Sequence, residues 1–72
     1  MTIFENAFAR ANAAYITAQS DYITAAEKAA NNPTARNWAL ANKSFQAQQA
    51  ASAAAERTAQ AMHNEAYILA HA

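Results

Sequence analysis

The stretch that decides the fold is Asn31-Asn32-Pro33-Thr34. It holds the only proline of a 72-residue chain that has no glycine and in which about a third of the residues are alanine. Alanine is the strongest helix former, whereas proline cannot lie inside a helix without breaking its hydrogen bonds. The sequence therefore predicts two helices, over about residues 3–30 and 33–70, joined by a turn at 31–33.

The turn residues also predict how each helix ends. Asn32 as N-cap with Pro33 in the first helical position is a common entry to a helix, and Thr34 is the alternative cap. Pro33 disfavours the helical conformation at Asn32, so the first helix should end just before it. In a chain without glycine, Asn31 is the best candidate for a left-handed C-terminal cap.

The first helix is predicted to face its partner along a heptad seam. Thr2 and Glu5 fit a capping box at its start. Residues at alternating spacings of four and three then form the seam: Phe4, Phe8, Ala11, Tyr15, Ala18, Tyr22 and Ala25. Ile16 and Ile23 form a second ridge one position further round, which makes the apolar arc wider than a two-helix contact needs.

The second helix repeats this pattern with smaller side chains. Its predicted seam is Trp38, Ala41, Phe45, Gln48, Ser52, Ala55, Ala59, Met62, Ala66 and Leu69. A second ridge at seven-residue spacing comprises Leu40, Ala47, Ala54, Ala61 and Ile68. Trp38 is interpreted as closing the end of the core, with a role in a partner interface as the alternative.

The two predicted helices differ in length. At 1.5 Å per residue they span about 42 and 57 Å. If the chain folds back at Asn31-Asn32, the first helix ends near the level of Gln60. The segment 61–72 then projects beyond it, and its apolar side chains are expected to pack on a second copy or on another protein. The alternative is that the segment bends back.

The composition indicates that the hairpin completes its core by association. A chain of 72 residues forms one small domain, here residues 1–72, and a mostly alanine core buries little apolar surface. No cysteine is present, so disulfides cannot compensate. We expect an all-α antiparallel hairpin that oligomerises into a helical bundle. The interface candidates are Phe4, Phe8, Tyr15, Ile16, Tyr22, Ile23, Trp38, Leu40, Phe45, Met62, Tyr67, Ile68 and Leu69.

No residue pattern points to catalysis or to a cofactor. His63 and His71 are eight residues apart with Tyr67 between them, whereas a zinc site needs three or four nitrogen or sulfur ligands. The carboxylates do not pair, and the absence of glycine excludes phosphate-binding and dinucleotide-binding loops. We therefore expect no enzyme activity, no cofactor and no metal.

Charge and hydropathy narrow the class of partner. Five basic and five acidic residues balance, and the basic ones form no stripe, which argues against nucleic acid. No apolar run is long enough to span a membrane. The start, Met1-Thr2-Ile3-Phe4-Glu5, lacks the features of a signal peptide, so we expect a cytoplasmic protein. Export by a route without a cleavable signal peptide is the alternative.

The segment Ala25-Ala26-Glu27-Lys28-Ala29-Ala30-Asn31-Asn32-Pro33-Thr34 precedes a long helix rich in Gln, Ser and Ala. Over residues 22–72 this order resembles the small helical-hairpin proteins of bacterial type III secretion, the needle subunits and the needle co-chaperones. The resemblance implies self-polymerisation, or chaperoning of a polymerising subunit, with the C-terminal helix as the assembly surface. The expected function is thus non-enzymatic association with copies of the chain or with another helical protein. The alternative is a small secretion chaperone or adaptor for one specific protein.

Overall fold

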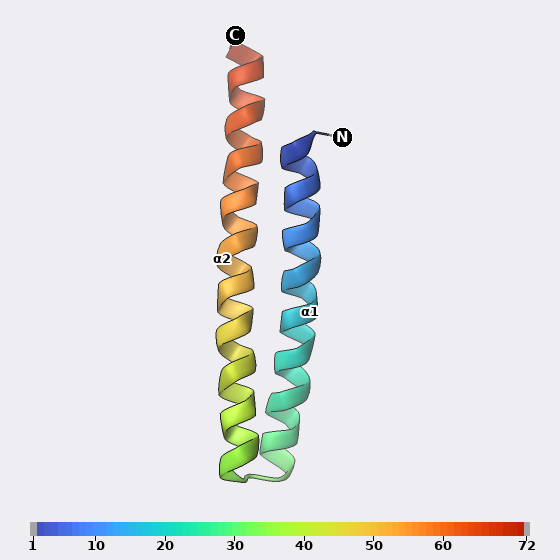
Figure 1. The fold of residues 1–72 in the computed structure, drawn as a ribbon, viewed down its shortest axis with the longest axis vertical. Coiled ribbons are helices and arrows are strands. Elements are labelled where there is room, and N and C mark those ends of the chain that lie inside the picture. Colours follow the sequence, from blue (N-terminus) through green and yellow to red (C-terminus); the bar gives the residue numbers. More distant parts are fainter. Residues whose placement is uncertain (1, 72) are drawn as a thin grey trace.

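The computed structural model describes residues 2–71 and consists there of two antiparallel helices (Figure 1). Helix α1 runs from Ile3 to Asn31 and helix α2 from Ala35 to His71, and they pack side by side along the whole of α1. The predicted all-α hairpin is therefore confirmed. The molecule is a rod of 57 × 16 × 13 Å with a radius of gyration of 16.6 Å. A compact chain of this length would have a radius of about 11 Å.

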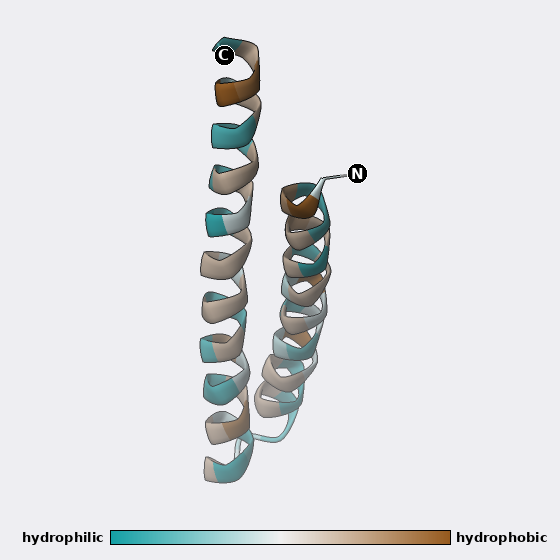
Figure 2. Ribbon diagram, turned by 45° about the horizontal axis from the view of Figure 1, so that its top comes forward, coloured by the Kyte–Doolittle hydropathy of each residue, from teal (hydrophilic) through white to brown (hydrophobic). Residues whose placement is uncertain are grey.

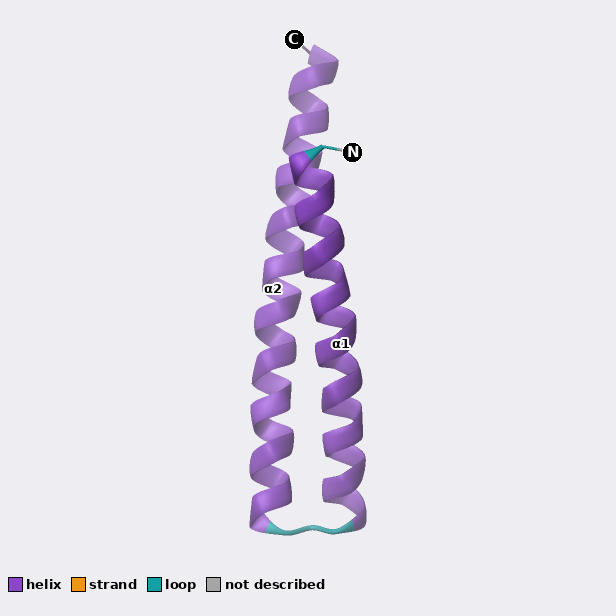
Figure 3. Cartoon of the chain, turned by 45° about the vertical axis from the view of Figure 1, so that its right-hand side comes forward, coloured by secondary structure: helices purple, strands orange, loops and turns teal. Residues whose placement is uncertain are grey.

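Both helices begin at a threonine cap. The Glu5 N–H donates to Thr2 Oγ1 over 3.1 Å, which is the threonine half of the predicted capping box. The Asn37 N–H donates to Thr34 Oγ1 over 3.0 Å, so Thr34 is the cap of α2 and Pro33 lies before it. Figure 3 shows the short loop that joins the two helices at this end. The prediction of Asn32 as the cap is wrong, and the alternative is right. The second helix consequently begins at residue 35, two residues later than predicted.

The end of α1 also differs from the prediction. Asn31 remains helical, and no described residue has the positive φ of a left-handed cap. Asn32 ends the helix in an extended conformation, with φ −139° and ψ 83°, because the proline that follows it disfavours the helical region. Its carbonyl is satisfied by Asn37, whose Nδ2 donates to it over 2.9 Å. This side-chain bond replaces the expected left-handed cap.

The Thr34 cap makes a direct prediction. We expect Thr34→Ala to lower the free energy of unfolding by about 1 kcal/mol, because the Asn37 N–H loses its partner. Thr24→Ala is the matched control: Thr24 is exposed within α1, and alanine is the better helix former there. Thermal melts followed by circular dichroism would measure both. Equal melting temperatures for the two variants would contradict a capping role for Thr34.

The contact between the helices follows the predicted seam of α1 but a rotated seam of α2. In α2 the least exposed residues near the turn are Asn37 and Ala41, at 7% and 4% exposed, whereas Trp38 is 53% exposed. Trp38 therefore does not close the core, and that prediction is wrong. Its neighbour Asn37 faces inward because it bonds both Thr34 and Asn32. The facing residues of α2 are Asn37, Ala41, Ser44, Gln48, Ala51, Ala55, Thr58, Met62 and Glu65.

The core itself is made of alanine. Ala29 and Ala41 are the buried hydrophobic residues in the described chain, and no large side chain there is fully buried. Figure 2 shows the same character: pale, alanine-rich turns dominate both helices, and strongly hydrophobic ones are scattered. Since apolar area drives folding, a core of this kind contributes little stabilisation by itself.

The C-terminal end of α2 projects past the start of α1 (Figure 1). The projection is shorter than predicted, because Phe4 borders a cavity shared with Glu65, Ile68 and Leu69. Helical side chains lean toward the N-terminus of their helix, so Phe4 reaches beyond the level of its own backbone. The projecting segment is 66–71, in which every residue is exposed although Phe4 borders Ile68 and Leu69, and not 61–72. The prediction's last residue, Ala72, lies outside the described residues.

Candidate protein-interaction surfaces

Most of the predicted interface residues are exposed in the hairpin. Nine of the thirteen are at least 40% exposed, and they are Phe4, Ile16, Ile23, Trp38, Leu40, Phe45, Tyr67, Ile68 and Leu69. Ile3, which the sequence did not single out, is exposed as well. Its place at the first turn of α1, outside the seam spacing, gave no signal in the sequence. Scattered exposed apolar residues are normal, but so many on a small chain indicate a surface for a partner.

The other four predicted interface residues lie half-buried between the helices. They are Phe8, Tyr15, Tyr22 and Met62. Tyr22 makes the clearest contact across the hairpin, with its ring edge against Phe45 at a centroid distance of 5.4 Å and an interplanar angle of 60°. This geometry is favourable for an aromatic pair. These side chains belong first to the contact between α1 and α2.

The heptad spacing sorts the exposed residues onto two sides of the hairpin. In an antiparallel helix pair, residues that come directly after a seam residue in the sequence lie on the same side of the hairpin in both helices. We call the surface formed by Ile16, Ile23, Trp38 and Phe45 the isoleucine face. Two grooves support this grouping. One, of about 290 Å³, is lined by Tyr22, Trp38, Ala41, Asn42 and Phe45. The other, of about 550 Å³, joins Phe8 and Ile16 of α1 to Met62 of α2.

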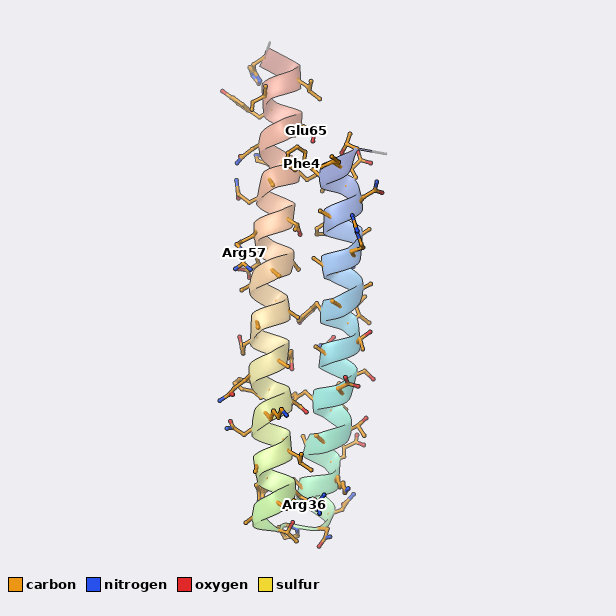
Figure 4. All side chains as sticks on the ribbon, in the orientation of Figure 1. Phe4, Arg36, Arg57 and Glu65 are labelled. Carbon is orange, nitrogen blue, oxygen red and sulfur yellow. The ribbon has the colours of Figure 1, made fainter. Side chains whose placement is uncertain are left out.

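The opposite side carries the positive charge. The same spacing places all five cations there, and we call the surface of Arg10, Lys28, Arg36, Lys43 and Arg57 the basic face. Figure 4 shows Arg57 projecting from the side of α2 that points away from α1. Leu40 and Ile68 are the exposed large apolar residues of α2 on this side. The hairpin is therefore two-sided, although its net charge is zero.

The open end of the rod forms a third apolar region. A cavity of about 360 Å³ is lined by Phe4, Ala61, Asn64, Glu65, Ile68 and Leu69, and Figure 4 shows Phe4 directed toward α2 near Glu65. Glu65 Oε2 is buried there without a hydrogen-bond partner, as is Gln48 Oε1 further along the seam. Unpaired buried oxygens weaken the hairpin, so the contact between the helices is imperfect at both positions.

His71, at the end of α2, contacts a residue of its own helix. The ring of His71 stacks on Tyr67 at 4.1 Å, and its Nδ1 lies 2.9 Å from the Tyr67 carbonyl oxygen. Among residues 2–71, no three His, Cys, Asp or Glu side chains gather where they could hold a metal ion. Neither described helix has an apolar stretch long enough to cross a membrane.

The chain was compared with known protein families, curated proteins and solved structures. None of the three comparisons finds a match.

Proposed function

We propose that this hairpin is a non-enzymatic interaction or assembly subunit that buries its helix faces against copies of itself or against another helical protein. One observation carries the proposal: ten large hydrophobic residues are exposed, whereas none in the described chain is fully buried. A domain that is stable as a monomer would bury more of such residues in its core. Association would bury them.

The surface area supports the same conclusion. The hairpin exposes 5302 Å², whereas a compact protein of 7.7 kDa would expose about 4,300 Å². The surplus of about 1,000 Å² is close to the roughly 800 Å² that each partner buries in a standard interface. Two hairpins packed together would form a four-helix bundle, in which side chains now exposed become core.

Size-exclusion chromatography with light scattering tests the proposal. We expect a dimer or larger oligomer at micromolar concentration. We also expect a melting temperature that rises with protein concentration, because association stabilises the folded state by mass action. A monomer that melts cooperatively at a concentration-independent temperature would refute self-association.

A second candidate function is that of a small chaperone or adaptor for one specific protein. The observation that favours it is the projecting segment 66–71, where Tyr67, Ile68 and Leu69 are all exposed at one end of the rod. Such an end fits a site on a larger partner, in keeping with the resemblance to type III secretion hairpins. The protein would then act in the cytoplasm or be exported without a cleavable signal peptide. The test is whether the isolated protein folds without a partner. A well-folded homo-oligomer would argue against a chaperone that needs its partner.

A further inference from the structure

We infer that the isoleucine face is the contact surface and that its occupant is a second copy of this chain. The inference rests on the proposed function of association and adds the surface and the partner. Ile16, Ile23, Trp38 and Phe45 are 41–56% exposed and lie on the same side of the rod. Of the two long sides of the hairpin, this one carries more of the large exposed apolar residues, since Leu40 and Ile68 are those of α2 on the basic face.

The four side chains lie in two lines on one side of the hairpin. Ile16 and Ile23 are seven residues apart on α1, and Trp38 and Phe45 are seven apart on α2, so each pair lies along one line of its helix. The contact between Tyr22 and Phe45 joins the two lines across the seam. The groove beside Tyr22 and Trp38 continues this surface toward the turn.

The charge distribution favours a second copy as the partner. A two-fold contact places a surface against itself, so a surface rich in one sign of charge would repel its mate. The isoleucine face carries no lysine or arginine, because all five lie on the basic face. The carboxylates on its side are Glu5, which lines the groove beside Ile16, and Glu56; both lie nearer the open end of the rod than the four apolar residues. The basic face also carries Asp21, seven residues before Lys28, but contact through it would still bring five cations of each copy together.

The hairpin as a whole has enough surplus surface for such a contact. A stable interface needs about 800 Å² from each partner, and the hairpin exposes about 1,000 Å² more than a compact chain of its mass. In the dimer the isoleucine face becomes the core of a four-helix bundle, and the basic face remains in water. Trp38, the only tryptophan of the chain, moves from solvent into that core.

Two matched variants test the inference. Ile23→Glu adds one carboxylate to the isoleucine face, and Leu40→Glu adds one to the basic face. The two residues are similarly exposed, at 50% and 43%, and glutamate is a good helix former at both. By sedimentation equilibrium, we expect Ile23→Glu to raise the dimer dissociation constant at least about 100-fold, since it buries an unpaired charge. We expect Leu40→Glu to change it less than about threefold.

Fluorescence supplies an independent readout. On dilution of the natural chain, the emission of Trp38 should shift to longer wavelength as the dimer dissociates. A dimer that Ile23→Glu does not weaken selectively, or whose Trp38 emission does not respond to dilution, would overturn the choice of face and leave the proposed function intact. A cooperatively folded monomer would refute self-association and this inference together.

Discussion

Ala41→Asp is expected to prevent the hairpin from folding. Ala41 is 4% exposed and, with Ala29 of α1, makes up the buried hydrophobic residues of the described chain. A carboxylate there would replace a nearly buried methyl group, and an uncompensated buried charge costs about 3–5 kcal/mol. A core in a chain of this size rarely supplies more than about 3–5 kcal/mol in total. The loss therefore equals the whole stability of the fold.

The control for this change is Ala39→Asp, two residues away on the exposed side of α2. It introduces the same residue in the same helix, so both variants share the cost of lower helix propensity. Far-UV circular dichroism should show helix loss for Ala41→Asp and near-normal helix content for Ala39→Asp. Equal helix content in the two variants would mean that residue 41 does not lie in the seam.

Tyr22→Ala is expected to cost about 2 kcal/mol, the second largest effect. Tyr22 is half-buried between the helices and contacts Phe45 edge to face, so its removal leaves a gap on both sides of the seam. Phe45→Ala should cost less, because Phe45 is more exposed. Urea unfolding of the two single variants and of the double variant, at one protein concentration, should give a coupling of about 0.5–1.5 kcal/mol.

Tyr67→Ala is the control for the aromatic pair. Tyr67 lies beyond the reach of α1 and contacts His71 of its own helix, so its removal should change stability by less than about 0.5 kcal/mol. A Tyr67 variant as unstable as the Tyr22 variant would show that loss of any tyrosine is harmful. A coupling near zero would show that the two rings do not stabilise each other.

The seam of α1 could be predicted from the sequence because its large residues all lie on one face of the helix. Phe4, Phe8, Tyr15 and Tyr22 recur at heptad spacing, and each faces α2 in the structure. The Thr2 cap was predictable for a similar reason, because threonine with glutamate three residues later satisfies two free backbone groups. In both cases a few bulky or polar side chains define the geometry without help from tertiary contacts.

The rotation of α2 could not be predicted in the same way. From Gln46 to Ala55 the helix offers small or polar residues in every direction, so the pattern does not choose a face. The choice is made at the turn, where Thr34 rather than Asn32 caps the helix and Asn37 bonds back to Asn32. Both cap residues are chemically competent, and only the folded turn distinguishes them.

The rotation of α2 also explains why the exposure of apolar residues could be predicted from the sequence but their grouping into faces could not. Exposure of many apolar residues follows from composition, because the chain holds more large side chains than an alanine seam can cover. Which of them share a side depends on the rotation of α2. Trp38 was expected at the end of the core, and it lies instead on the outer surface with Phe45. The isoleucine face therefore emerges only when both helices are placed.

The position of the buried residues has a consequence for how the rod opens and closes. Ala29, Asn37 and Ala41 all lie beside the turn, where contacting residues are close along the chain and their loops close at little entropic cost. Contacts at the far end, between Phe4 and Glu65, require almost the whole chain to be in place. We therefore expect the contacts between the helices to form first beside the turn and to break first at the open end. The contact of Phe4 with the C-terminal part of α2 is expected to be the first that thermal motion breaks.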